Sequence, residues 1–145
     1  MKKIEEYSLQ DWRKRIKEGY EKSMPCVTVV PYIGKEEIVT YDFPELLGRC
    51  PVTNIVDFYR VIIDFIPNKL IPELKSLKFY FMAYSEVRIS HEHLCSKIYK
   101  DFQQLIKPKK LLVRLLTNNR GGIYTTVQLG DLTIASDLKL REVHG

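Results

Sequence analysis

The chain has 145 residues, of which 45% are hydrophobic and 28% charged, and its formal net charge is +5. This length supports one domain with a substantial core, but it leaves little room for a second domain. No apolar run reaches the ~18 residues of a membrane span, and the charged N-terminus does not resemble a secretory leader. The positive charge favours anionic partners, such as a nucleotide cofactor or a nucleic acid, only slightly.

The chain has three cysteines, Cys26, Cys50 and Cys95, and no CxxC spacing. An odd number without that spacing argues against a disulfide framework and against a zinc knuckle. We therefore expect a cytoplasmic protein, with no membrane partner and no metal site.

The N-terminal part is predicted to be a basic helix followed by a connector. Ser8 suits the N-cap of a helix that ends near Lys22. The stretch 24–35 contains two prolines and a glycine, which favours a connector with a short strand at Val27–Val30. We expect residues 1–35 to form this segment and residues 36–145 to form a single domain.

Two strands and a loop are expected next. Glu37–Asp42 is rich in β-branched residues and predicts a strand, whereas the prolines and glycine of Phe43–Asp57 predict a loop. Phe58–Ile66 alternates in hydrophobicity and ends before Pro67, which is typical of a strand. Its apolar face comprises Tyr59, Val61, Ile63 and Phe65.

The period then becomes helical before it returns to that of strands. A first helix starts near Pro72 and a second spans about His91 to Ile106. The expected inward residues are Leu74, Leu77, Phe81 and Tyr84 in the first helix, and Leu94, Ile98, Phe102 and Leu105 in the second. Lys110–Thr117 and Ile123–Leu129 alternate again, and the loop 118–122 joins them as a hairpin.

This order predicts an α+β fold, in which a four-stranded antiparallel sheet carries two helices on one face in ββααββ order. The two edge strands of such a sheet would be unpaired. Edge-to-edge assembly of identical chains into a ring would pair them, and active sites would then lie between subunits.

Cys50 and Asp57 are the first candidates for chemistry. A loop cysteine between two strands can serve as a nucleophile, and Arg49 beside it could stabilise the thiolate; a small buried hydrophobic residue is the alternative. Asp57 could transfer protons if it is partly desolvated, or it could cap a turn. Cys26 and Cys95 are interpreted as structural.

Charged residues at three other places are candidates for binding. Lys75 and Lys78 share one face near a helix N-terminus, which suits a phosphate or merely a solvated surface. His91 and His93 point about 200° apart on a helix and would not share a metal, whereas His91 with Glu92 could bind a purine-like ring. Arg120, before Gly121 and Gly122, lies on a glycine hairpin with accessible backbone N–H groups or is simply exposed.

Four segments together resemble a known family: CPVTNIVDF from Cys50, ELKSLKFY at Glu73–Tyr80, His91-Glu92, and RGGI at Arg120–Ile123. They resemble the short, single-module NADPH-dependent 7-cyano-7-deazaguanine reductases, which have the tunnelling fold (T-fold) of GTP cyclohydrolase I. The resemblance covers roughly residues 37–129, and ELKSLKFY, the family's cofactor signature, is its most specific part.

The resemblance implies a two-step reduction of a nitrile to an aminomethyl group, on the route to queuosine in tRNA. Cys50 matches the nucleophile that forms a thioimide, and Asp57 matches the general acid/base. The positions that match substrate-binding residues are Glu73, Leu74, His91 and Glu92. The positions that match NADPH-binding residues are Lys75, Lys78 and Arg120, with Gly121 beside them. The family forms stacked homo-oligomeric rings, and 36–145 would be its single T-fold catalytic domain.

Two departures from the family pattern support an alternative. Ile55-Val56 replaces the usual Gln-Pro, and Ser85-Glu86-Val87-Arg88 replaces an Arg-Asn-His-Gly stretch. Both resemble an archaeal group that adds ammonia to the same nitrile on tRNA to form archaeosine, but that group lacks ELKSLKFY. A non-catalytic RNA-binding module is a further alternative, favoured by the basic first helix, although it has no use for a Cys50–Asp57 pair.

Overall fold

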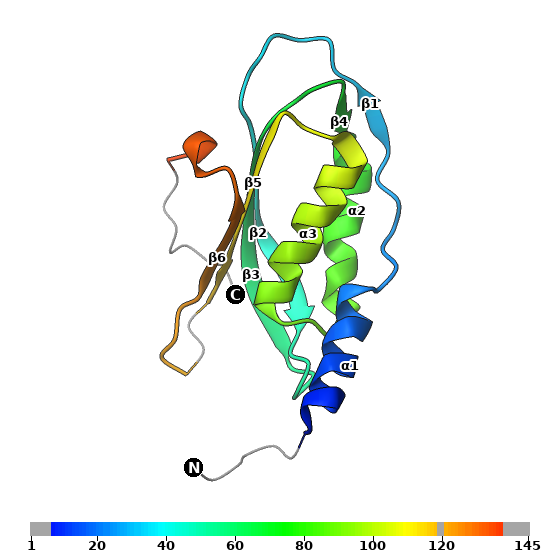
Figure 1. Cartoon of the computed structure of the whole chain (residues 1–145), viewed down its shortest axis with the longest axis vertical. Coiled ribbons are helices and arrows are strands. Elements are labelled where there is room, and N and C mark those ends of the chain that lie inside the picture. The colour runs from blue at the N-terminus through cyan, green and yellow to red at the C-terminus, as the bar shows by residue number, and fades with distance from the viewer. Residues whose placement is uncertain (1–6, 119–120, 138–145) are drawn as a thin grey trace.

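The computed structural model describes residues 7–118 and 121–137, and these form a four-stranded antiparallel sheet with helices packed on one side, beside a small two-stranded sheet (Figure 1). The larger sheet contains β2 (Val39–Arg49), β3 (Val56–Ile66), β5 (Lys110–Thr117) and β6 (Thr126–Gly130), in the order β2-β3-β5-β6. The helices α2 (Leu74–Met82) and α3 (His91–Ile106) lie between β3 and β5 in the chain and cover one face. The predicted ββααββ sheet is confirmed, with additional short elements around it.

The core lies between the helices and the sheet because each element presents one apolar face there. Along β3, the inward positions are Tyr59, Val61, Ile63 and Phe65, as the alternation predicts. In α2, the inward residues are Leu77, Tyr80 and Phe81, and Tyr84 follows in the short 3₁₀ helix η1 (Ala83–Glu86). Leu74 was predicted to join them, but it is 61% exposed because it borders an open cavity of about 300 Å³ between α2 and β2.

The predicted loop at Phe43–Asp57 is wrong over most of its length. Strand β2 continues to Arg49 and remains paired with β3 up to that residue. A shift in the pairing between Phe43 and Leu46 accommodates Pro44, which has no N–H to donate. Only residues 50–55 remain as the connection. The long strands therefore hold Cys50 on a short, fixed turn.

The N-terminal elements pack along the helices. Helix α1 (Leu9–Tyr20) starts at Ser8, whose side chain and that of Asp11 form a reciprocal cap, and it ends two residues earlier than predicted. Strand β1 (Val29–Pro31) pairs with β4 (Leu70–Pro72), so the predicted connector strand exists but is shifted. After β6, the 3₁₀ helix η2 (Leu132–Ile134) buries Ile134 against the rest.

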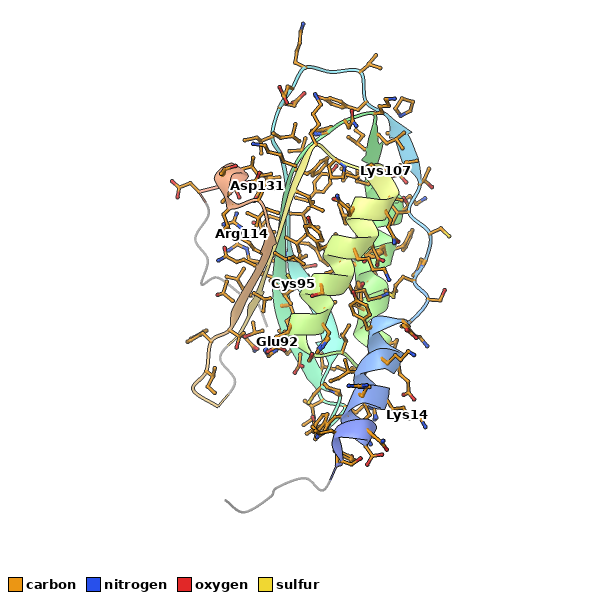
Figure 2. The ribbon with its side chains drawn as sticks, in the orientation of Figure 1. Lys14, Glu92, Cys95, Lys107, Arg114 and Asp131 are labelled. Atoms are coloured by element: carbon orange, nitrogen blue, oxygen red, sulfur yellow. The ribbon has the colours of Figure 1, made fainter. Side chains whose placement is uncertain are left out.

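The sheet face away from the helices contains buried ion pairs. Arg114 Nη2 lies 2.8 Å from Asp64 Oδ2, and Ser136 Oγ also donates to that carboxylate. Figure 2 shows Arg114 on this outer side of the sheet. Arg60 makes a two-pronged pair with Asp42, at 2.7 and 2.9 Å.

Candidate active site

Cys50 is the first residue of a tight turn between β2 and β3. Its backbone N–H donates to the carbonyl of Ile55 at 3.0 Å, and its carbonyl accepts from the N–H of Asn54 at 2.9 Å. Asn54 completes the turn with a positive φ of 63°, a conformation that asparagine adopts more readily than most residues. The Cys50 side chain is half-buried, so the thiol is held in place but accessible. We call residues 50–55 the Cys50 loop.

The segment 85–89 holds the Cys50 loop from one side. Arg49 exchanges backbone hydrogen bonds with Val87 and Ile89, at 2.9 and 3.0 Å. The Arg49 guanidinium donates to the carbonyls of Ser85 and Asn54, and Arg88 Nε donates to Asn54 Oδ1 at 2.9 Å. These contacts give Arg49 a structural role beside the loop. Its expected stabilisation of a Cys50 thiolate stays a prediction.

The residues that depart from the family pattern are part of this loop structure. The carbonyl of Ile55 accepts the Cys50 N–H, and Val56 pairs with Arg49 at the start of β3. The side chain of Ile55 is 62% exposed. The Ile55-Val56 pair therefore contributes its backbone to the closed turn.

Asp57 and Tyr59 form a buried hydrogen bond beside the loop. Asp57 is 4% exposed and Tyr59 is fully buried, and the phenol donates to Asp57 Oδ2 at 3.1 Å. Burial raises the pKa of the Tyr59 phenol, and the nearby Cys50 and Glu92 raise this pKa further. Tyr59 thus keeps its proton, and Cys50 and Glu92 lie near enough to act electrostatically on the phenol that is hydrogen-bonded to Asp57.

His91 and Glu92 start α3 at the same end of the sheet. Their side chains form a 2.9 Å pair between Nε2 and Oε1, and the Glu92 side chain is 59% exposed. Figure 2 shows Glu92 near the end of the sheet from which the Cys50 loop extends. His93 turns elsewhere, to Ser90 Oγ and the ring of Tyr20. Within residues 7–118 and 121–137, no group of three or more His, Cys, Asp or Glu side chains could hold a metal ion.

The ELKSLKFY residues form a second cluster at the start of α2. Glu73 is the N-cap, and its carboxylate accepts from the N–H groups of Lys75 and Ser76. These hydrogen bonds lower the pKa of Glu73. These two backbone N–H groups are therefore occupied by Glu73 and are not available to a phosphate. The exposed ammonium groups of Lys75 and Lys78 remain as the local positive charge, and Lys78 borders the cavity between α2 and β2.

The two clusters do not meet within one chain. The cavity beside Lys78 is lined by Asp42 of β2, whereas Cys50 follows Arg49 at the far end of the same strand. At about 3.3 Å per residue, these strand positions are roughly 25 Å apart. In Figure 1, α2 starts at the end of the molecule near β4, and α3 starts at the opposite end near α1. Arg120 lies outside the described residues, and Gly121 is exposed with a φ of 60°.

The other cysteines occupy different environments. Cys26 is exposed, whereas Cys95 is fully buried between α3 and the sheet (Figure 2). Burial raises the pKa of the Cys95 thiol to about 12, which makes it unreactive near neutral pH. Sequence reasoning assigned Tyr59 only to the core and missed its contact with Asp57. The available signal was that Asp57 and Tyr59 are two apart on one strand and share a face.

Comparisons with known sequences point to one family. A sequence model of the family described as "QueF-like protein" matches residues 56–133. Proteins named NADPH-dependent 7-cyano-7-deazaguanine reductase from Thermotoga petrophila and Thermotoga maritima are each 38% identical over 104 residues, which is 71% of this chain and 76% of theirs. The protein of that name from Chloroherpeton thalassium is 40% identical over 84 residues, covering 58% of this chain and 72% of its own.

A solved structure extends the agreement to the fold. The apo crystal structure of the archaeosine synthase QueF-Like superposes with a TM-score of 0.62 at 18% identity, over 67% of this chain and 95% of that one. At that identity, the likeness concerns the fold alone. With the sequence matches, it leads to one assignment: the chain belongs to the QueF-like protein family.

Proposed function

We propose that this chain reduces the nitrile of 7-cyano-7-deazaguanine to an aminomethyl group with NADPH; its relatives are named NADPH-dependent 7-cyano-7-deazaguanine reductases. The chain is then an oxidoreductase of queuosine biosynthesis. The observation that carries the proposal is that Cys50 lies on the turn between β2 and β3, beside the buried Asp57–Tyr59 hydrogen bond and near enough to Tyr59, as is Glu92, to raise its pKa. A nucleophile, a buried carboxylate and an exposed carboxylate at one place suit the activation and binding of a polar nitrile base.

Cys50 and Asp57 divide the covalent chemistry. Cys50 Sγ adds to the nitrile carbon, so a carbon–sulfur bond forms as the triple bond becomes the double bond of a thioimide. The nitrogen takes a proton as this happens, and Asp57 is the general acid that supplies it. Tyr59 donates to Asp57 Oδ2 and so helps to hold the carboxyl in place. Asp57, reprotonated from solvent, would supply the nitrogen with a second proton in the first reduction. The carbon–sulfur bond would then break as the carbon–nitrogen bond becomes double, so that Cys50 leaves as a thiolate before the second reduction.

Glu92 is the group that we assign to base recognition. Its carboxylate is 59% exposed and can accept two hydrogen bonds from the amino and ring N–H groups of a deazaguanine. His91 Nε2 lies 2.9 Å from Glu92 Oε1, and we propose that it orients this carboxylate and approaches the reacting centre. Glu73 and Leu74 are proposed to complete the binding of the base from the second cluster.

The residues present fit an anionic cofactor. Lys75 and Lys78 are exposed on the first turns of α2, and ammonium groups there can replace the water of a phosphate. With Arg120 and Gly121, they are the proposed NADPH contacts. NADPH supplies the two hydrides that convert the nitrile carbon to a methylene.

The separation of the two clusters leads us to propose an oligomeric site. Strands β2 and β6 are the edges of the sheet, and an unpaired edge is a surface at which another chain can add. In a head-to-tail ring of identical chains, α2 of one subunit would approach the Cys50 loop of its neighbour. Transfer RNA would be a partner only for the amidine-forming alternative. Over residues 7–118 and 121–137, no helix has both the length and the apolarity of a membrane span. A cytoplasmic location is part of the proposal.

One incubation tests the function. The protein is mixed with the free nitrile base and NADPH, and the nicotinamide absorbance and the product mass are followed. We expect two NADPH oxidised for each aminomethyl base formed. An unchanged absorbance, together with an amidine product when ammonia is added, would instead identify the ammonia-adding activity.

A further inference from the structure

Helix α1 makes a direct contact with the Cys50 loop. Arg15 Nη1 donates to the carbonyl oxygen of Pro51, the residue after the nucleophile, at 2.9 Å. On its other side, the Arg15 guanidinium packs over the ring of Tyr7, 4.2 Å from the ring centroid. Tyr7 in turn meets Trp12 edge to face. Arg15 is therefore fixed between an aromatic pair and the loop that carries Cys50.

A second contact fixes α1 to the other end of the same loop. A Cβ on Gly19 would lie 2.0 Å from the carbonyl oxygen of Arg88, so the helix backbone approaches segment 85–89 more closely than a side chain allows. Arg88 Nε donates to Asn54 Oδ1 at 2.9 Å. Helix α1 thus reaches the Cys50 loop through Pro51 directly and through Asn54 by way of Arg88.

We propose that Arg15 is a positioning residue for Cys50, and that α1 is part of the catalytic scaffold. The inference rests on the proposed function, in which Cys50 Sγ adds to a nitrile carbon. Such an addition needs the reacting atoms about 3–3.5 Å apart, and a misplacement of ~1 Å can cost ~100-fold in rate. The loop has no regular structure of its own, so an external hydrogen bond at Pro51 limits how far Sγ can move.

The experiment compares Arg15→Ala with Arg15→Lys and with Arg13→Ala, which removes the same charge from an exposed position on the same helix. Hydrogen exchange is measured at the amides of Cys50 and Asn54, which donate within the loop. Arg15→Ala should speed exchange at both by about 10-fold, the worth of one hydrogen bond. Arg15→Lys should restore most of the protection, since Pro51 accepts from a single nitrogen, and Arg13→Ala should match the wild type.

The chemical arm measures thioimide formation by intact mass, without NADPH. Arg15→Ala should slow it by about 10-fold or more. The affinity for the nitrile base, measured in a Cys50→Ala background, should not change. Gly19→Ala, which removes no charge, should give the same signature because its methyl group pushes α1 off Arg88.

Equal exchange and equal adduct rates in Arg15→Ala and Arg13→Ala would overturn the inference. So would a loss of base affinity that matches the loss of rate, because Arg15 would then bind substrate. If the wild type forms no adduct, the proposed function fails. In that case, the exchange measurement still decides whether Arg15 holds the loop.

Discussion

The Tyr59 phenol donates to Oδ2 of Asp57 across 3.1 Å, and both side chains point to the same face of β3. Because burial raises the pKa of Tyr59, the phenol remains a donor throughout the working pH range. We expect Tyr59→Phe to slow turnover by about 10-fold or more, since a hydrogen bond to a charged group contributes roughly 1.5–3 kcal/mol. The ratio of wild-type to Tyr59→Phe turnover should be the same at about pH 6 and about pH 9, since both values lie below the ordinary phenol pKa of ~10. A factor that disappears at the higher pH would mean that the phenol itself titrates.

Loss of the Asp57 carboxyl should slow turnover more than loss of the Tyr59 hydroxyl. A positioned general acid contributes about 10²–10⁴-fold, so Asp57→Asn should turn over at least ~100-fold more slowly while it still binds the nitrile base. Steady-state rates with binding measured separately would check this. Near-normal turnover would reduce Asp57 to a structural residue of β3.

The fold was largely predictable because its elements have clear periods. Helix α3 and strand β5 have the predicted limits, since each repeats one face without interruption. The end of β2 was missed because Pro44 and Gly48 are typical of loops, and only pairing with β3 extends the strand across them.

The site was less predictable than the fold. Cys50, Asp57 and Glu92 were candidates from the residues alone, and the family resemblance gave them specific roles. In contrast, nothing local to Arg15 indicates its contact with Pro51, 36 residues away. Hydrophobic periods report which face of an element is buried, and they carry no information on which polar side chains meet across such distances.

Glu92 offers a test of base recognition. We expect its exposed carboxylate to accept hydrogen bonds from the N–H groups of the bound base, which would otherwise have no acceptor in the complex. Loss of the carboxylate should therefore lower the affinity for the base several-fold more than the affinity for the cofactor. Glu92→Gln should therefore weaken binding of the nitrile base while the Michaelis constant for NADPH changes little. An equal loss of both would assign Glu92 a structural role at the start of α3.

Lys78 offers the matching test of cofactor binding. A charge-assisted contact with a phosphate contributes about 1.5–3 kcal/mol, so Lys78→Ala should raise the Michaelis constant for NADPH by at least ~10-fold. Adduct formation at Cys50 should survive, since that step needs no cofactor. Lys69→Ala, which removes the same charge from an exposed turn before β4, serves as the control. The same increase in both variants would point to a general charge effect.

The most direct test of the account is the mass of the protein after incubation with the nitrile base alone. If Cys50 is the nucleophile, the wild type gains the mass of one base, the peptide that contains Cys50 carries it, and Cys50→Ala gains nothing while it remains folded. An adduct that persists in Cys50→Ala, or one that maps to Cys26 or Cys95, would contradict the assignment of the active site.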